Sequence, residues 1–387
     1  MHTTISRAHA LQAPLRLGAL EIPNRAFLAP LAGVSDIPFR RICQELGAGL
    51  TYVEMLSATA LCYGNRKTLA MLARHPTESQ LGVQVTGRTA EEVGRAIALL
   101  DREGFDAIDI NMGCPVKKVV AAGCGSALLK EPDRLVATLS AARQATSRPL
   151  SAKIRLGFTR DDVNVTAVSA LVATHADMLT IHGRTRSESY DRAVDLDGIA
   201  AGVRAARNMR STILTLSNGD IFGAPDAARH LETTGADGVM VSRGALGNPW
   251  VFRALAAGEG AHPDAAEWED VVLRHLSYQC EHYCNEGLAA LLMRKHLLWY
   301  AKGFAGSKRL RERLSLVTTL SEASEIIRDF ARQVGYRTLR FDGAQGHLSD
   351  GHARVEGNDD WGSGGVQHDP KHEMDRIHDS GVGAEGL

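Results

Sequence analysis

The chain has 387 residues, of which 44% are hydrophobic and 23% are charged. This length and composition allow a large buried core, with room for one large domain and one smaller one. No run of about 18 consecutive apolar residues occurs, and the start of the chain lacks the apolar segment of a signal peptide, so we expect a folded cytoplasmic protein without a membrane span.

Charge and cysteine usage exclude further classes. Residues 341–387 hold ten acidic and three basic side chains, so residues 1–340 carry a formal charge of +6 although the whole chain carries −1. A surplus this small is only weak evidence for a polyanionic partner. The six cysteines are too sparse for a disulfide framework, so we expect reduced thiols.

Eight short apolar runs, rich in β-branched residues, predict eight strands. They cover residues 27–33, 50–55, 81–87, 107–114, 150–157, 178–185, 213–220 and 238–245. Amphipathic segments lie between them; in residues 89–104, Thr89 is a predicted N-cap ahead of Glu91 and Glu92. Strands and helices that alternate in this way predict a (β/α)8 TIM barrel rather than an open doubly wound sheet.

After about residue 260 only helical periodicity remains. Cys280 and Cys284 are expected to share one helix face there as packed thiols rather than as metal ligands. The last residues are rich in Gly, Asp and His without an apolar period. We therefore expect an N-terminal extension (1–19), a catalytic barrel (20–260), an all-helical domain (261–338) and a disordered acidic tail (339–387).

Polar residues collect in or just after the second half of the predicted strands. They are Gln84, Asn111, Cys114, Lys153, Arg155, His182, Arg184, Asn218, Asp220, Ser242 and Arg243. Buried polar groups cost free energy unless they are hydrogen-bonded, and barrel enzymes carry their sites at the carboxyl ends of the strands. The clustering therefore predicts a site at that end.

The residue types in this cluster indicate a cofactor. An inward-pointing Lys153 needs an anionic partner. Gly219, Gly244 and Arg243, after the seventh and eighth strands, suit a phosphate. Taken singly, each glycine segment could instead be an ordinary turn, and His182 could be a hydrogen-bonded core histidine. Together the set suits FMN, whose reduced form is an anion that a lysine stabilises. No H-E-x-x-H motif, acidic cluster or Cys/His quartet occurs, so we expect no metal.

The segment DINMGCPVKK, residues 109–118, places Cys114 directly after a predicted strand and before two lysines. From its position alone this cysteine has four interpretations: a small buried hydrophobe, a metal ligand, half of a disulfide, or an acid or nucleophile at the mouth of a pocket.

Seven segments, in this order and spacing, resemble the tRNA-dihydrouridine synthases. They are LAPLAGVSDIPFR, DINMGCPVKK, GSALLKEPDRL, AKIRLG, IHGRTR, SNGDI and RGALGNPWVF. The resemblance covers roughly residues 20–335. The segment LLMRKHLLWYAKG is similar to the bacterial B-type branch, whereas SESYDRAVDLDGI looks more like the C-type. Ser242 and Cys124 depart from the family pattern, and we give Cys124 no role.

The resemblance implies FMN-dependent reduction of particular tRNA uridines to 5,6-dihydrouridine, with NADPH as electron donor. Cys114 would be the catalytic residue and would donate a proton to C5 of uracil while the reduced flavin delivers a hydride to C6. A thiol of pKa about 8.5 holds such a proton at neutral pH. The implied cofactor-binding residues are Pro30, Leu31, Ala32, Gln84, Asn111, Lys153, His182, Asn218, Asp220, Arg243 and Gly244.

Basic residues complete the expected site. We expect tRNA contacts at Lys117, Lys118, Arg184, Arg186, Arg294 and Lys295, and the helical domain adds Lys302, Lys308, Arg309, Arg311 and Arg313. We expect a monomer. Two alternatives remain: an FMN barrel oxidoreductase that acts on a small pyrimidine or enone, and an RNA-binding protein without flavin. The basic helices favour tRNA over a small molecule, and Cys114, Lys153 and His182 argue against a protein without flavin.

Overall fold

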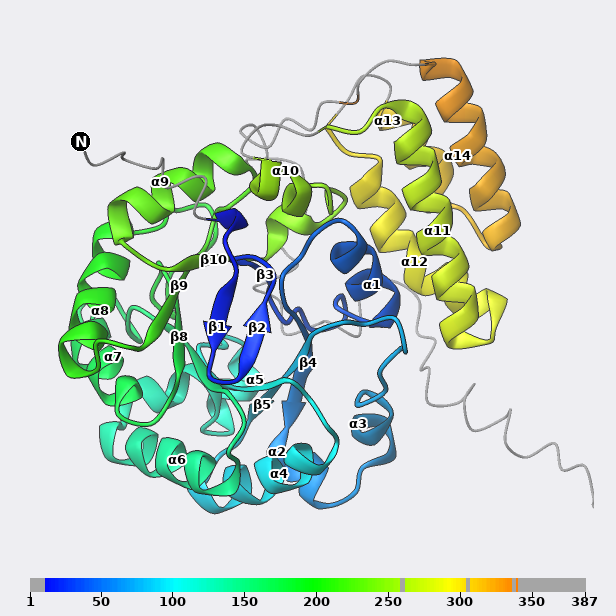
Figure 1. The fold of residues 1–387 in the computed structure, drawn as a ribbon. Helices are drawn as coiled ribbons and strands as arrows, with labels where there is room; N and C mark the ends of the chain where they lie inside the picture. Colours follow the sequence, from blue (N-terminus) through cyan, green and yellow to red (C-terminus); the bar gives the residue numbers. More distant parts are fainter. Residues whose placement is uncertain (1–10, 258–261, 304–306, 336–338, 340–387) are drawn as a thin grey trace, which may run out of the picture. The chain divides into compact units, whose positions relative to one another are not determined.

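The structure is a computed structural model that describes residues 11–257, 262–303, 307–335 and 339. Figure 1 shows a barrel of strands wrapped by helices, followed by a group of longer helices. Apart from Leu339, the predicted disordered tail lies outside the described residues. Among the helices described, none is both long enough and apolar enough to cross a bilayer.

Eight parallel strands form the barrel, and each overlaps a predicted run, although the first strand shares only two residues with residues 27–33. They are β3 (Ala26–Leu28), β4 (Thr51–Ser57), β5 (Leu81–Thr86), β6 (Ala107–Met112), β7 (Leu150–Arg155), β8 (Met178–His182), β9 (Leu214–Asn218) and β10 (Gly238–Val241). Each strand pairs with its neighbours in chain order, and β10 also pairs with β3. The Leu28 N–H donates to the Leu50 carbonyl at 2.9 Å and closes the ring between β3 and β4. The predicted (β/α)8 barrel is confirmed.

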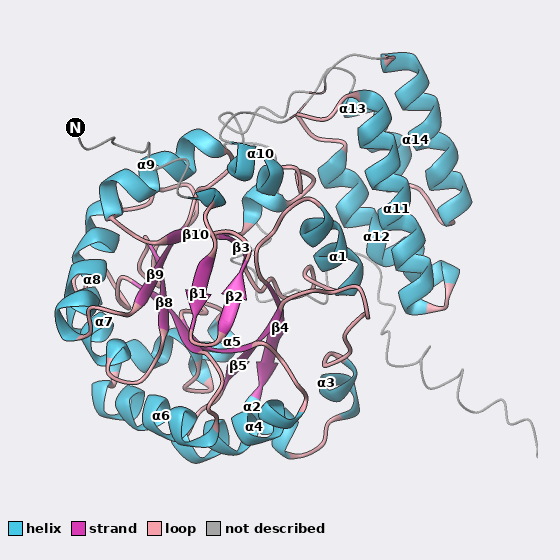
Figure 2. Cartoon of the chain, in the orientation of Figure 1, coloured by secondary structure: helices cyan, strands magenta, loops and turns pink. Residues whose placement is uncertain are grey.

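Helices connect the strands and cover the outside of the barrel (Figure 2). The α-helices are α1 (Ile37–Glu45), α2 (Ala58–Cys62), α3 (Arg66–Ala70), α4 (Ala90–Arg102), α5 (Lys117–Ala121), α6 (Pro132–Ala145), α7 (Val165–Ala173), α8 (Leu196–Met209), α9 (Ala224–Thr234) and α10 (Val251–Ala257), and the short 3-10 helices are η2 (Gly125–Lys130) and η3 (Arg243–Ala245). The Thr89 hydroxyl accepts from the Glu92 N–H at 3.2 Å, which confirms the predicted N-cap of α4.

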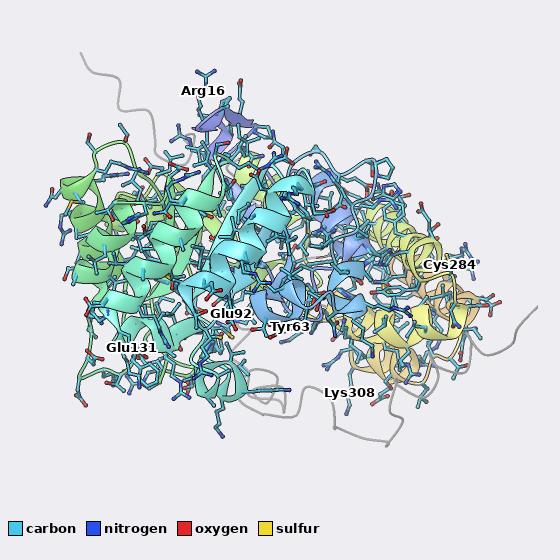
Figure 3. All side chains as sticks on the ribbon, turned by 90° about the horizontal axis from the view of Figure 1, so that it is seen from below. Arg16, Tyr63, Glu92, Glu131, Cys284 and Lys308 are labelled. Carbon is cyan, nitrogen blue, oxygen red and sulfur yellow. The ribbon has the colours of Figure 1, made fainter. Side chains whose placement is uncertain are left out.

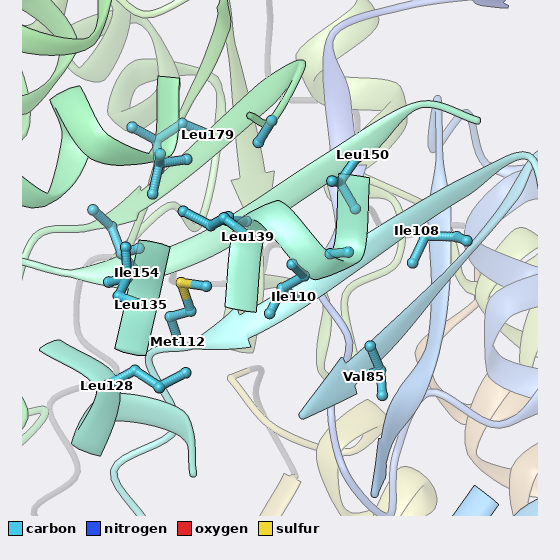
Figure 4. Packing of buried hydrophobic residues seen from close by; sticks show 14 of the residues in the cluster. Val85, Ile108, Ile110, Met112, Leu128, Leu135, Leu139, Leu150, Ile154 and Leu179 are labelled. Carbon is cyan, nitrogen blue, oxygen red and sulfur yellow. The ribbon is translucent and has the colours of Figure 1, made fainter. Parts of the chain in front are cut away.

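Side chains alternate between the two faces of each strand, as the strand period requires. In β6, Ile108, Ile110 and Met112 join the apolar cluster that also contains Leu135 and Leu139 of α6 (Figure 4). The residues between them, Asp109 and Asn111, bond to side chains of neighbouring strands instead. The strand therefore packs against the helices with one face and presents polar groups to the barrel interior with the other.

The amino-terminal end of the barrel is filled with apolar side chains. Phe27, Tyr52 and Met178 lie there, all fully buried. A hairpin of β1 (Leu15–Leu17) and β2 (Leu20–Ile22) packs on the same cluster and turns at Gly18, whose φ of +61° favours glycine. We had expected only an extension over residues 1–19, because strands of three residues are too short to show a period.

In the described part of the chain, four helices follow α10: α11 (Ala265–Tyr283), α12 (Glu286–Tyr300), α13 (Ser307–Ser315) and α14 (Leu320–Val334). Trp268, Met293 and Phe330 belong to their shared apolar core. Helix α11 packs against α1, where Arg41 bonds to Glu281 at 2.8 Å. The all-helical character predicted after residue 260 is confirmed for the residues described.

The cysteines are all free, as expected. The prediction that Cys280 and Cys284 share a helix face is wrong. Cys284 ends α11 as its C-cap in the left-handed conformation, with φ of 50°, so its side chain leaves the helical period. Both thiols are exposed rather than packed, and Figure 3 shows Cys284 at the edge of the helical region.

Candidate active site

Hydrogen bonds join the polar side chains of β5, β6 and β7 inside the barrel. Ser151 Oγ and Gln84 Nε2 donate to the two carboxylate oxygens of Asp109, at 2.6 and 2.7 Å. Asn111 Nδ2 donates to Gln84 Oε1 at 2.8 Å. These bonds fix the direction of both amides, and each amide nitrogen keeps a second N–H. A ligand above this network meets donors that are already oriented.

Asp109 anchors the network, and the sequence analysis gave it no role. It is fully buried, and burial raises the pKa of its carboxyl to about 6, against hydrogen bonds from Ser151 and Gln84 and the charge of Lys153. A signal was present in the sequence: Asp109 lies two residues before Asn111, so both must share the inward face of one strand.

The loop that carries Cys114 is tied to this network. Asn111 Oδ1 accepts from the backbone N–H groups of Gly113 and Cys114, at 3.1 and 2.8 Å. Ser126 Oγ donates to the Cys114 carbonyl at 2.9 Å, and Arg155 Nε donates to the Gly113 carbonyl at 2.9 Å. Four bonds therefore hold the backbone on both sides of the thiol.

The Cys114 side chain is half-buried, which decides its protonation state. Burial raises the pKa of the thiol above its usual value, while a backbone hydrogen bond at Val116 and the charges of Arg155 and Lys153 act in the opposite direction. The thiol is therefore protonated at neutral pH and can act as a proton donor.

Lys153 on β7 and His182 on β8 extend this network. Together with Gln84 and Asn111 they make up what we call the polar ring. Lys153 Nζ donates to Asn218 Oδ1 at 2.8 Å, and Asn218 Nδ2 in turn donates to the Met240 carbonyl at 2.7 Å. Burial, and then the charge of Arg155, lowers the pKa of Lys153 to about 8. Burial and the surrounding cations hold the pKa of His182 well below its usual range, so the imidazole is neutral.

Charged groups meet where β9 and β10 end. Asp220 lies between two arginines: its carboxylate accepts from Arg184 at 2.6 Å and from Arg243 at 2.7 Å. The ring of Tyr190, from the loop after β8, lies 4.3 Å from the Arg243 guanidinium and is a residue that sequence reasoning missed. A Cβ on Gly244 would lie 2.0 Å from the Ile221 carbonyl oxygen, so only glycine allows these two loops to meet.

The remaining predicted cofactor residues lie on the loop after β3. Pro30 and Leu31 are half-buried and Ala32 is exposed. The Leu31 N–H donates to Ser35 Oγ at 2.9 Å, and the Leu31 carbonyl accepts from the Ser35 N–H at 2.9 Å. The loop is thus fixed by its own bonds at the same end of the barrel as Cys114.

The predicted tRNA contacts fall into two groups. Lys117 and Lys118 on α5, and Lys308 and Arg309 on α13, are exposed; Figure 3 shows Lys308 at the border of the helical region. Arg186 and Arg294 are half-buried. By contrast, Arg184 is fully buried against Asp220, and Lys295 Nζ donates to the Gly33 carbonyl. The last two side chains are occupied within the protein.

Comparison with known proteins identifies the family of the chain. The family model described as dihydrouridine synthase matches residues 27–334. The tRNA-dihydrouridine synthase B of Pasteurella multocida is 35% identical, over 80% of this chain and 93% of its own. A probable tRNA-dihydrouridine synthase of Rhodobacter capsulatus is 36% identical, over 76% of this chain and 91% of its own.

Among solved structures, histamine dehydrogenase from Rhizobium sp. 4-9 has a TM-score of 0.51 at 12% identity and shares the fold. The similarity covers 70% of this chain and 51% of the dehydrogenase. The match to the family model spans the barrel and the helices after it, and the two relatives align over most of their own length. The chain belongs to the dihydrouridine synthase family.

Proposed function

We propose that this protein reduces particular uridines of tRNA to 5,6-dihydrouridine, with FMN as its cofactor and NADPH as the electron donor. The observation that carries the proposal is the position of Cys114: a protonated thiol on a loop that Asn111 ties to the polar ring of a barrel. Membership in the dihydrouridine synthase family supports the same reaction.

The polar ring fits a flavin. Gln84, Asn111, Lys153 and His182 would hold the ring system, since each amide keeps a free N–H and Lys153 uses one of its three donors. Pro30, Leu31 and Ala32 would line it through their backbone, and the ribityl chain and phosphate would lie along Asn218, Asp220, Arg243 and Gly244. When bound, the flavin supplies the hydride that reaches C6 of uracil.

Cys114 supplies the proton. A thiol whose pKa lies above its usual value gives up no proton to water at neutral pH, but it can protonate the carbon next to a developing negative charge. The two bonds from Asn111 Oδ1 fix the loop, so the thiol reaches C5 without further ordering of the backbone. Asn111 then has two tasks, one toward the flavin and one toward Cys114.

The substrate base must leave the stacked tRNA to enter the barrel, which requires a surface that holds the backbone. We propose Lys117, Lys118, Arg186 and Arg294 for these phosphate contacts, together with Lys308 and Arg309. Arg184 and Lys295 are bonded within the protein, so we give them other roles. Arg184 orients Asp220, and Lys295 holds the loop after β3. A tRNA substrate also supports a cytoplasmic location.

The test is turnover on an unmodified tRNA transcript. The purified protein is incubated with the transcript and NADPH, and its nucleosides are analysed by mass spectrometry for uridines that gain two hydrogens. We expect the product with the wild type and with Cys124→Ala, but not with Cys114→Ala. NADPH oxidation that depends on a small pyrimidine or enone, with unchanged tRNA, would favour the small-molecule alternative instead.

A further inference from the structure

We propose that Asp36, His275 and His296 form a binding site for a divalent first-row transition metal ion such as zinc. The three residues come from three elements: Asp36 is the N-cap of α1, His275 lies on α11 and His296 lies on α12. One ligand atom from each lies within 4.8 Å of the others. Such an ion would join the first helix of the barrel to the helical region, which pack together beside the strands (Figure 1).

The two histidines have ring nitrogens that make no hydrogen bond to the residues described. Both are fully buried, and among the residues that the structure describes neither ring nitrogen of His296 has a hydrogen-bond partner. His275 Nε2 also has none. A buried polar atom without a partner costs free energy, and here two such rings meet edge to face, with centroids 4.7 Å apart, so the cluster calls for an explanation. A metal ion accepts these lone pairs directly.

The surroundings resemble the outer shell of a metal site. His275 Nδ1 lies 3.1 Å from the Tyr300 hydroxyl, the kind of bond that fixes which nitrogen of a ligating histidine faces the ion. Asp36 Oδ2 accepts from Gln279 Nε2 at 3.1 Å and from the Tyr283 hydroxyl at 3.0 Å. Within the described part of the chain, Asp36 Oδ1 accepts only the Phe39 N–H, at 3.1 Å, so a lone pair of the carboxylate remains.

Charges near the cluster allow a cation. The carboxylate of Asp36 faces the two imidazoles, and the nearby Arg40 is neutralised by Glu78 at 2.7 Å. Lys295 is the opposing charge; its ammonium is turned to the Gly33 carbonyl, on the loop after β3. Two imidazoles and one carboxylate leave a single positive charge on a bound divalent ion, which a water or hydroxide ligand can share.

The ligand set selects the class of metal. Two imidazole nitrogens and one carboxylate oxygen suit zinc and its neighbours, whereas magnesium and calcium require oxygen ligands throughout. Ligand atoms on a tetrahedral zinc are about 3.3 Å apart, so an ion bound here requires the three ligand atoms, which lie within 4.8 Å of one another, to draw together. Our expectation of no metal rested on local motifs, which cannot reveal a site whose residues come from three distant segments.

Metal analysis of the full chain, purified with its flavin and without chelator, tests the proposal. We expect about one equivalent of zinc or another first-row metal per chain, lost in His296→Gln and in Asp36→Asn. His230→Gln is the matched control, because His230 is also buried with an unpartnered Nε2, but its Nδ1 bonds to Ser217 Oγ at 2.7 Å and it does not belong to the three-residue cluster. The control should keep the wild-type metal content.

Thermal unfolding gives a second readout that needs no variant. Protein stripped by a strong chelator should unfold at a lower temperature, and Zn²⁺ but not Mg²⁺ should restore the wild-type Tm. Two results together would overturn the site: less than about 0.1 equivalents of metal in protein from cells grown with added zinc, and a Tm that does not change when Zn²⁺ is added. Neither readout uses tRNA or NADPH, so failure here is separate from failure of the proposed reaction.

Discussion

The two ends of the barrel are built from the same strands but have opposite contents. At the amino end, Phe27, Tyr52 and Met178 pack into a sealed apolar cluster under the β1–β2 hairpin. At the carboxyl end, the strands present a polar network whose members satisfy one another. Strand β8 shows the contrast within five residues, since it begins at Met178 and ends at His182. One end stabilises the fold, and the other is left free for chemistry.

The largest effect should come from the polar end. Cys114→Ala should reduce the rate of uridine reduction by about 10²–10⁴-fold, because the proposed proton donor is removed while the loop bonds to Asn111 remain. Flavin content and Tm should not change. Single-turnover oxidation of the reduced protein by tRNA measures the rate, and Cys124→Ala is the control. A Cys114→Ala protein with wild-type turnover would contradict the assigned role.

The apolar end should show the reverse behaviour. Phe27→Ala should lower the free energy of unfolding by about 3–5 kcal/mol, because a fully buried ring is replaced by a cavity. Denaturant unfolding measures the change. The Phe27→Ala protein that remains folded should keep its turnover per bound flavin. If Phe27→Ala abolished turnover without lowering stability, the amino end of the barrel would not serve stability alone.

Between the two ends, Asp109 should give a pH-dependent stability. The pKa of its carboxyl is about 6 in the folded protein against an ordinary 3.8, so the folded state binds more protons between these values. The free energy of unfolding should therefore fall as pH rises from about 4 to 6, by at most about 3 kcal/mol from this group, and then stay constant. Unfolding curves of wild type and Asp109→Asn should differ in this slope; parallel pH profiles would argue against a buried titrating carboxyl.

The smallest effect concerns surface charge. Lys118→Ala, at the carboxyl end, should weaken tRNA binding a few-fold and reduce the salt slope by about 0.7–0.9, as the loss of one phosphate contact requires. Arg16→Ala, on the exposed face of β1, is the matched control; Figure 3 shows Arg16 and Lys308 on opposite sides. If Lys118→Ala and Arg16→Ala changed the tRNA affinity and the salt slope equally, tRNA would not bind preferentially at the carboxyl end of the barrel.

The sequence predicts the barrel well because its strands are regular. Each apolar run could be placed by its composition, and Asn111 shares the inward face of β6 with Asp109, as the alternation of side chains along a strand requires. The β1–β2 hairpin could not be predicted in this way, since it packs on the apolar cluster of Phe27 and its strands are too short to show a period of their own. The C-cap position of Cys284 was missed because the predicted helix continued through it.

The site was predictable as a set of residues but not as a network. Position in the strands brings Gln84, Asn111 and Lys153 together, yet nothing local shows that Asp109 orients Gln84. Likewise, a basic residue near the mouth is expected to face solvent, and only the fold shows that Arg184 is buried against Asp220. The orientation of Gln84 and the burial of Arg184 both depend on a partner residue from a distant segment of the chain. The catalytic and cofactor roles themselves stay predictions.

The most direct test is mass spectrometry of tRNA from cells with and without this gene, with each uridine position scanned for the gain of two hydrogens. We predict that deletion removes dihydrouridine from at least one position, and that the wild-type gene and Cys124→Ala restore it while Cys114→Ala does not. Restoration by Cys114→Ala, or a deletion that alters no uridine while the purified protein also leaves tRNA transcripts unchanged, would contradict the account.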